Sequence, residues 1–485
     1  MNGRRMRGWG ALPLLLALGA CSLAPADVRP AAPVPPAWPT GPAYPPVAPA
    51  AAIGWEEVFR DPRLRQLIGT ALANSRDLRI AAANAAGARA QFRIQRAALL
   101  PTVGATAGYS YASRRAADGS TSGEDNYAVD LGTTAFEIDL FGRLRSQSRA
   151  AFDRYLATEA GARAIRLALI GDIADLWLLH AADQSLLRIA TETAAAAERS
   201  VALTRSRLRG GIAPRTDLRQ AEQTLATARA DVARQRTALA QDVNALELLV
   251  GAPVPAALLP GPVEEAAETL GEVPAGLDSA VLLRRPDVLA AEYDLRAANA
   301  DIGAARAALF PRISLTSLVG FASTALSSLF DGDSFTWNVA PSATYPIFRA
   351  GAGRAGVAAA QAGRDAALAA YERAIQSAFR DVADALARRG TIADELAATE
   401  LQVAAAADTY DLATRRYRGG IDSFLASLDA ERSLYAAQRS LVATQLSRGS
   451  NRVALYRALG GDPLLDPGAA PAGGAPTGQS ARPGS

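Results

Sequence analysis

Hydrophobic and polar positions alternate in short stretches of the chain, which is the period-two pattern of β-strands. In the second half, apolar residues of one parity are Ile313, Leu315, Val319, Phe321, Phe335, Trp337, Val339, Tyr345 and Ile347. The first half repeats the pattern with Val103, Ala105, Ala107, Tyr109 and Tyr111. We therefore predict four strands, at 102–112, 126–141, 312–322 and 334–348, with polar loops at 113–125 and 323–333.

The rest of the chain is rich in alanine, leucine and arginine, and long parts of it lack proline, which favours helices. No proline occurs from 102 to 213 or from 347 to 462. We predict two long helices, 145–209 and 352–418, of about 100 Å each at 1.5 Å per residue. Return helices at 215–250 and 423–459, and helices before each strand pair (61–100 and 278–310), reach only about half that length. Two short helices placed end to end would match one long helix.

The chain states this pattern twice. "AALLPTV" (97–103) recurs as "AALFPRI" (307–313), at an offset of 210 residues, and "RLRGGI" (207–212) recurs as "RYRGGI" (416–421). The predicted fold is thus mainly α, with a duplicated helix–strand–strand–long helix–helix unit. The first repeat spans 55–265 and the second 266–461.

Four amphipathic strands cannot close a barrel, because barrels in the bacterial outer membrane need at least eight strands and lipid does not tolerate open sheet edges. The strands must then be shared between subunits. Two, three or four chains would supply eight, twelve or sixteen strands, and the pattern alone does not choose among these numbers. It predicts an oligomer.

The first twenty residues (1–20) have the pattern of a secretory signal, with a basic start followed by the apolar "ALPLLLAL". "LGAC" (18–21) resembles a bacterial lipobox, so we expect Cys21 to carry an N-acyl diacylglycerol with palmitate-type chains. An ordinary signal peptide with an incidental cysteine is the alternative. Residues 21–54 are rich in proline and alanine and are expected to be extended, and residues 462–485 to be disordered.

Charge and composition exclude several functions. The 51 basic and 48 acidic residues balance once the three arginines of the signal are removed, so no nucleic-acid partner is expected. Cys21 is the only cysteine and His180 the only histidine, so we predict no metal site, no cofactor, and no catalytic residue. The motif "GAGRAG" (351–356) imitates a dinucleotide-binding loop, but a long helix follows where a second strand would be required.

Several long stretches resemble the outer-membrane efflux proteins that include TolC and OprM, most closely the lipid-anchored NodT-type branch. They are "WEEVFRDPRLRQLIGTALANSRDLRIAAAN" (55–84), "RRPDVLAAEYDLRAANADIGAARAALFPRISL" (284–315) and "RYRGGIDSFLASLDAERSLYAAQ" (416–438). The resemblance covers nearly the whole chain after Cys21. It implies a homotrimer that forms a twelve-stranded transmembrane β-barrel in the outer membrane of a Gram-negative bacterium. A twelve-helix tunnel would continue into the periplasm.

The resemblance also implies function, partners and sites. The chain would be the passive exit channel of a tripartite multidrug efflux pump, with a periplasmic adaptor and an inner-membrane pump of the resistance-nodulation-division (RND) type as partners. Leu425 and Asp429 would form the periplasmic gate, with Gln220 at the matching place in the first repeat. The tips that face the adaptor would carry Arg207, Arg209, Gly210, Gly211, Arg416, Arg418, Gly419 and Gly420. We expect Gly210 and Gly419 to adopt the left-handed conformation that ends each long helix.

Two alternatives stay open. The same channel could serve type I protein secretion, although the lipobox favours efflux. A periplasmic coiled-coil scaffold would explain the long helices, but it would leave four strands with aromatic residues of one parity unexplained.

Overall fold

The computed structural model describes residues 23–44, 54–273 and 279–460 of the 485-residue chain. The predicted signal peptide, Cys21 and the tail at 462–485 lie outside the described residues. Two compact units are present, and each is described by itself. The first comprises Met1–Ala31, Ala82–Ala160 and Leu289–Arg373, and the second Ala32–Ala81, Gly161–Val288 and Ala374–Ser485.

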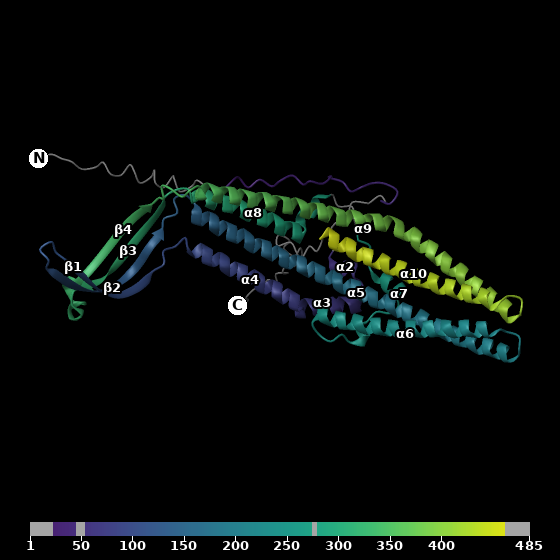
Figure 1. Cartoon of the computed structure of the whole chain (residues 1–485). Coiled ribbons are helices and arrows are strands. Elements are labelled where there is room, and N and C mark those ends of the chain that lie inside the picture. Colours follow the sequence, from purple (N-terminus) through teal and green to yellow (C-terminus); the bar gives the residue numbers. More distant parts are fainter. Residues whose placement is uncertain (1–22, 45–53, 274–278, 461–485) are drawn as a thin grey trace, which may run out of the picture. The chain divides into compact units, whose positions relative to one another are not determined.

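The elements follow the predicted order twice (Figure 1). The first copy contains α2 (Trp55–Val58), α3 (Pro62–Asn74), α4 (Arg76–Ala97), β1 (Gly104–Arg115), β2 (Thr121–Glu137), α5 (Arg143–Arg209) and α6 (Arg215–Val250). After α7 (Val263–Ala266), the second copy contains α8 (Pro286–Ala307), β3 (Arg312–Ser323), β4 (Phe335–Thr344), α9 (Ala352–Arg418) and α10 (Phe424–Leu459). Both long helices contain 67 residues, which confirms the duplicated unit with a long helix and a return helix in each copy.

Two predicted helices are interrupted. The segment 61–100 divides at Ser75, whose backbone is extended, into α3 and α4. The segment predicted as a helix at 278–310 begins with a 3₁₀ turn over Ser279–Arg284, and α8 starts only at Pro286. Proline has no N–H and disfavours the helical conformation in the residue before it, so a continuous helix cannot pass through this position.

The first unit is built around one antiparallel sheet in the order β1-β2-β3-β4. Its pairs join residues of equal parity, such as Ala107 with Val129, Leu131 with Val319, and Val319 with Trp337. One face of the sheet therefore carries those residues of the predicted apolar set that lie within the strands. Val103, Tyr345 and Ile347 lie outside them, because β1 begins at Gly104 and β4 ends at Thr344, two residues before Pro346, and not at 348 as predicted. A bulge between Thr133 and Phe136 shifts the register by one residue, so that Phe136 pairs with Leu315. At this bulge the backbone of Ala135 has a φ of 55°.

The first hairpin is tighter than expected. We predicted a loop at 113–125, but β1 continues to Arg115 and β2 already begins at Thr121. The turn between them is an Asp-Gly turn, in which Asp118 accepts hydrogen bonds from the backbone N–H and the hydroxyl of Ser120 and Gly119 has a φ of 86°. The Asp-Gly turn lets the strands extend close to it, although the residues that flank it are polar.

The N-terminal segment is extended, as its proline content predicts. In the first unit it runs antiparallel to α8: the carbonyl of Leu23 accepts a hydrogen bond from Arg306, and Arg29 forms an ion pair with Glu292. In the second unit the hydroxyl of Ser279 donates to the carbonyl of Pro35, and Trp38 stacks on Phe379 with ring centroids 5.1 Å apart. Side chains of a proline-rich segment thus add to packing that the segment could not provide alone.

The core of the second unit is formed by the buried faces of α5, α9, α10 and the short elements before α8. Trp177 and Tyr456 are among its largest fully buried side chains. The indole N–H of Trp177 donates to the carbonyl of Leu258 at 3.2 Å. Among the described residues, none of the helices combines the length and the apolar character required to cross a bilayer.

Candidate functional site at the helix tips

Each long helix ends in the same glycine turn, and both turns belong to the second unit. In the first, the N–H of Ile212 donates to the carbonyl of Arg207, and the N–H of Gly211 to that of Leu208. The second turn repeats these bonds from Ile421 and Gly420. This is a Schellman motif, in which the residue after the cap adopts the left-handed conformation. That residue is Gly211 or Gly420, each with a φ of 73°, so our assignment of Gly210 and Gly419 was wrong by one position.

The second return helix begins at Phe424, one residue after the predicted start at 423. Ser423 is the N-cap residue of α10, and its side chain makes no capping hydrogen bond. Asp422, the residue before this N-cap, accepts two hydrogen bonds from Arg416, of 2.6 and 3.1 Å. These bonds hold the pKa of the Asp422 carboxyl below its usual range. Asp422 thus closes the turn by an ion pair across it.

The predicted tip arginines fall into two classes. Arg207 is half-buried: its guanidinium lies 4.4 Å from the ring centroid of Tyr417 and donates to the carbonyl of Arg418 at 2.9 Å. Arg416 forms an ion pair with Asp422. The side chains of Arg209 and Arg418 are exposed, and neither forms an ion pair within the described parts of the chain. Arg209 and Arg418 are therefore the tip cations available to a partner.

The two tips pack against each other through a small apolar core. Val201 of α5 and Leu218 and Ala221 of α6 pack with Tyr417 of α9 and with Phe424 and Leu428 of α10. The rings of Tyr417 and Phe424 have centroids 5.4 Å apart. The turns themselves expose Ile212 and Ile421, by 74% and 68%. Each tip therefore presents an isoleucine and an arginine outside a packed base.

The predicted gate residues lie on the exposed face of α10, one helical turn apart. Leu425 is 52% exposed. The Asp429 side chain is 63% exposed and its carboxylate lies 3.8 Å from the guanidinium of Arg432, one turn further on. The same helix buries Phe424 and Leu428 on its other face. Leu425 and Asp429 are thus free to line a surface that this single chain does not cover.

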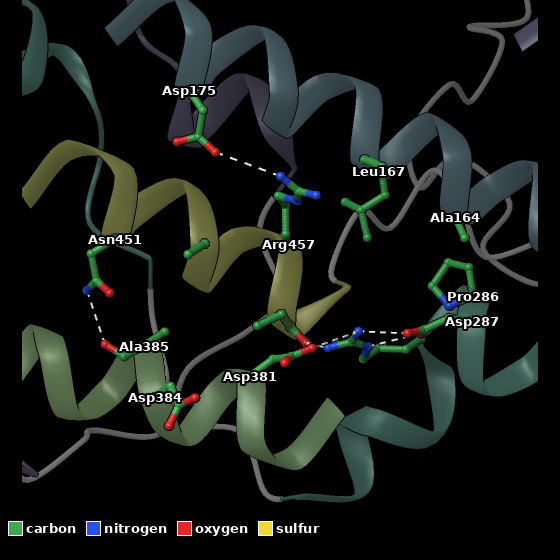
Figure 2. Close-up of a pocket in the computed structure, with 14 residues that line it drawn as sticks. Ala164, Leu167, Asp175, Pro286, Asp287, Asp381, Asp384, Ala385, Asn451 and Arg457 are labelled. Atoms are coloured by element: carbon green, nitrogen blue, oxygen red, sulfur yellow. Dashed lines mark hydrogen bonds and ion pairs between the residues drawn. The ribbon is translucent and has the colours of Figure 1, made fainter. Parts of the chain in front are cut away.

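A cavity of about 560 Å³ in the second unit was not anticipated from the sequence (Figure 2). Arg457 reaches from α10 toward α5, where it lies 2.8 Å from Asp172 and 3.8 Å from Asp175. A Cβ on Gly171 would stand 2.2 Å from the Arg457 side chain, so only glycine leaves room for this arginine. The cavity's arginines are already neutralised by its carboxylates, which indicates a structural role.

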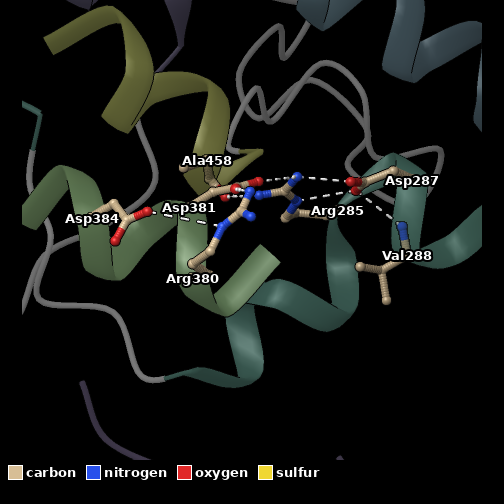
Figure 3. Close-up of polar contacts among 7 residues, drawn as sticks. All are labelled: Arg285, Asp287, Val288, Arg380, Asp381, Asp384 and Ala458. Carbon is tan, nitrogen blue, oxygen red and sulfur yellow. Dashed lines mark hydrogen bonds and ion pairs between the residues drawn. The ribbon is translucent and has the colours of Figure 1, made fainter. Parts of the chain in front are cut away.

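Arg285 makes the second set of polar contacts at this cavity (Figure 3). Its guanidinium donates to both carboxylate oxygens of Asp287 and to the carbonyl of Ala458, at 2.7–3.0 Å, and lies 3.5 Å from Asp381. It therefore caps the end of α10 while fixing the start of α8. "RRPDV" marks this residue in the sequence, but only the structure shows what it binds.

His180, the only histidine of the sequence, is buried and has acidic neighbours. Its Nδ1 lies 3.7 Å from the carboxylate of Asp242 on α6, and burial lowers the pKa of the imidazole. Burial and the nearby Asp183 raise the pKa of Asp242 to about 6. No group of three acidic, histidine or cysteine side chains is arranged to hold a metal ion within the described ranges.

The glycine motif at 351–356 forms the turn that leads into α9. Gly351 has a φ of 84° at the entrance to α9, and Gly142 has a φ of 76° before α5. A Cβ on Gly353 would lie 2.8 Å from Leu309. These glycines permit the change from strand to helix and a close approach of α9 to the residues after α8.

Comparisons with known proteins agree on one family. The model of the outer membrane efflux protein family matches residues 67–252 and 277–461, one match for each repeat. The probable efflux pump outer membrane protein TtgC of Pseudomonas putida is 45% identical over 452 residues, covering 92% of this chain and 93% of that protein. Outer membrane protein OprJ of Pseudomonas aeruginosa is 40% identical, over 94% of this chain and 95% of its own length.

Solved structures give the same result. CusC, described as forming a transmembrane channel, is 38% identical and superimposes with a TM-score of 0.80, covering 91% of this chain and all of that one. The open state of the MtrE outer membrane channel of Neisseria gonorrhoeae is 37% identical with a TM-score of 0.79, over 91% of this chain and 98% of that one.

Proposed function

Because the chain belongs to the outer membrane efflux protein family, we propose that it is the outer-membrane exit channel of a tripartite efflux pump of the RND type. Small toxic compounds would pass through it passively, and the pump would supply the energy. The observation that carries the proposal is 45% identity, over more than nine-tenths of the chain, to proteins named as the outer membrane components of antibiotic, toluene and solvent efflux pumps. The protein is located in the outer membrane, as its relatives are.

The proposed partners follow from this place in a pump. A periplasmic adaptor would contact the tips through Arg209, Arg418, Ile212 and Ile421, which the single chain leaves exposed. An exposed arginine beside an apolar side chain is a composition typical of contact surfaces. The inner-membrane pump would lie beyond the adaptor. We propose no catalytic activity and no cofactor.

The assembly we propose is a homotrimer. One chain supplies four antiparallel strands, and three chains supply the twelve strands of a barrel in outer-membrane lipid. Six long helices, with the helices that extend them, would form the tunnel. We also propose that Cys21 carries the N-acyl diacylglycerol, which adds a second membrane attachment to the barrel.

Within this trimer Leu425 and Asp429 would close the tunnel at its periplasmic end. Three copies of Asp429 around one axis repel each other unless water or cations separate them. Arg432, one turn away, would reduce this repulsion in each subunit. The first repeat carries Thr216 and Gln220 at the matching positions, so the proposed ring has threefold symmetry.

Deletion of the gene and growth on dyes, detergents and antibiotics tests the proposed function. We expect the deletion strain to become several-fold more susceptible to compounds of at least one of these classes, and a plasmid copy to restore tolerance. Unchanged tolerance together with a defect in secretion of one protein would overturn the efflux proposal. The detergent-corrected mass of the purified protein tests the trimer separately.

A further inference from the structure

A cavity of about 430 Å³ lies in the first unit, where the strands meet the helices. It is lined by the segment from β2 to α5, the segment from α8 to β3, and residues around the end of β4. Three of the lining residues are arginines, Arg143, Arg312 and Arg349, and two are acids, Glu137 and Asp139. Whether an arginine stays available to a ligand depends on how these side chains are paired.

Arg143 and Asp139 are fully engaged. The guanidinium of Arg143 donates to both carboxylate oxygens of Glu137, at 2.9 and 2.6 Å. Asp139 accepts hydrogen bonds from the backbone N–H and the guanidinium of Arg145, at 2.9 and 3.3 Å. These two pairs tie the end of β2 and the residues after it to the first turn of α5, which is a structural role.

Arg312 and Arg349 are not engaged in this way. Nε of Arg312 lies 3.7 Å from the Glu137 carboxylate that Arg143 already binds, and the Arg312 side chain is 65% exposed. Arg349 is exposed, and in the part of the chain that the structure describes its side chain forms no ion pair and no hydrogen bond. With Arg145 included, four arginines face two carboxylates, so the cavity keeps a surplus of positive charge.

Arg312 lies on the polar face of the sheet. It pairs with Thr344, and its neighbour on the same face, Ser314, pairs with Ser342, with the two serine hydroxyls 2.8 Å apart. These positions alternate with Leu315 and the other residues of the apolar face. In a barrel in the outer membrane, the apolar face contacts lipid and the polar face lines the interior. The cavity that Arg312 lines therefore opens toward the interior of the proposed channel.

An aromatic pair gives this cavity an apolar wall. Phe141 and Phe310 both line it, and their rings stack with centroids 4.6 Å apart. An apolar wall lowers the local dielectric constant and strengthens the attraction between charges relative to open water. Guanidinium groups bind carboxylate and phosphate groups through paired N–H donors. Two available arginines beside an apolar wall thus suit an organic molecule with such an anionic group.

We propose that Arg312 and Arg349 bind the carboxylate or phosphate groups of acidic solutes during their passage through the channel. This inference deepens the proposed function and rests on it, because only in a closed barrel does the polar face of the sheet become a channel wall. Three chains would place three such sites at one level, where the strands join the helices. The sites would raise the local concentration of acidic solutes at that level.

Block of the channel current by polyanions tests the site. The purified full-length protein is inserted into a planar lipid bilayer in about 0.15 M salt, where the Debye length is about 8 Å. Tripolyphosphate or citrate is added to both sides. All proteins carry Leu425→Ala with Asp429→Ala, so that the proposed acidic gate neither limits the current nor repels the probes. In this background we expect at least one of the two probes to block the current.

Substitution of the two arginines should weaken the block. Arg349→Gln is the mildest variant, because it breaks no ion pair within the described ranges. We expect Arg349→Gln or Arg312→Gln to raise the half-blocking concentration about threefold, and the two together about tenfold. Arg312→Lys with Arg349→Lys keeps both charges and should be blocked at a lower concentration than the glutamine pair. The current without probe is measured first for each variant.

The matched control removes the same charge from the other end of the sheet. Arg114 and Arg115 end β1 at the first hairpin, more than about 35 Å from Arg312 along the strands, which is several Debye lengths at this salt concentration. We expect Arg114→Gln with Arg115→Gln to leave the half-blocking concentration as it was.

The outcomes separate the site from the channel. Absence of block by both probes in a conducting protein would overturn the site, and so would equal block of the parent and the glutamine pair. An equal rise of the half-blocking concentration in the hairpin control would show that the block does not depend on this cavity. A protein of trimeric mass that carries no current in any variant would instead contradict the proposed function.

Discussion

In the second unit, burial of one carboxyl group, that of Asp242, makes its pKa different in the folded and the unfolded protein. Asp242 is 6% exposed, beside Asp183 and 3.7 Å from the imidazole of His180, and its pKa is raised to about 6. The folded protein binds this proton more tightly than the unfolded chain, where the value is 3.8. Stability from this group is therefore fully present below about pH 4 and is lost as the pH rises through about 6.

Replacing Asp242 with asparagine should remove this pH dependence. We expect Asp242→Asn to raise the free energy of unfolding at pH 8 by about 2 kcal/mol and to change it little at pH 4. Denaturant or thermal unfolding of the purified protein at both pH values measures this difference. The exposed Asp408→Asn is the matched control. Equal effects of the two substitutions at pH 8 would contradict the role of the buried site.

The glycine turns allow a second test of single residues. Gly211 has a φ of 73°, and nothing lies within 4 Å of a Cβ placed there, so a side chain would meet backbone strain alone. We expect Gly211→Ala to destabilise the tip by about 1 kcal/mol. Gly210→Ala should be neutral or stabilising, because Gly210 precedes the left-handed position. A lower thermal midpoint for Gly210→Ala than for Gly211→Ala would show that the cap has been assigned to the wrong glycine.

At the scale of elements, Arg285 joins three helices by one side chain. It caps the carbonyl of Ala458 at the end of α10, binds Asp287 at the start of α8, and lies 3.5 Å from Asp381 of α9. A Cβ at Gly460, where the φ is 60°, would stand 2.7 Å from the Arg285 side chain. The end of α10 is thus shaped around this arginine.

We expect Arg285→Ala to lower the free energy of unfolding by about 2 kcal/mol, because it leaves the buried carbonyl of Ala458 without its donor and removes the guanidinium bound to Asp287. The neighbouring Arg284 is exposed, so Arg284→Ala is a matched control with the same loss of charge. Protease sensitivity at the end of α10 and unfolding in denaturant would both report the change. Similar stability of the two variants would rule out this fastening role.

The elements also show how far the sequence could predict the fold. Proline-free stretches and strand parity predicted the order of elements because both signals are local. The tight first hairpin was missed since polar residues around Asp118 and Gly119 were read as a loop, although Asp-Gly is itself a turn signal. The break before Pro286 was missed because apolar residues continue on both sides of it.

The site was predictable in position but not in contacts. Both tips could be located from their repeated "RGGI", yet the position of the left-handed residue depends on backbone hydrogen bonds that the sequence does not show. Arg207 and Arg209 look alike in the sequence. Only the structure shows that the guanidinium of Arg207 packs on the ring of Tyr417, more than two hundred residues away. Arg285 and Arg457 were missed for a similar reason, since Arg285 binds Ala458 and Arg457 binds Asp172, and both of these partners are distant in the chain.

At the scale of the whole molecule, the prediction concerns the proposed gate. Leu425 and Asp429 lie on the exposed face of α10, and three such faces would meet at the tunnel axis. We expect Leu425→Ala with Asp429→Ala to make cells that lack the pump several-fold more susceptible to large hydrophilic antibiotics, because the closed end would leak.

The duplication again provides the control. Thr216→Ala with Gln220→Ala changes the matching positions of the first repeat and should leave susceptibility as it was. Measuring antibiotic susceptibility in strains with equal amounts of each protein in the outer membrane compares the two. Equal leakage through both variants would place the constriction elsewhere.

The exposed position of Leu425 and Asp429 on one helix of each chain has a genetic consequence. A ring of identical chains assembles from subunits of every allele that the cell expresses. In a cell that carries a wild-type gene and a leaky one, subunits mix, and most assemblies contain at least one altered member. If one altered subunit breaks the ring, the leaky allele is dominant, whereas alleles that merely fail to fold are recessive.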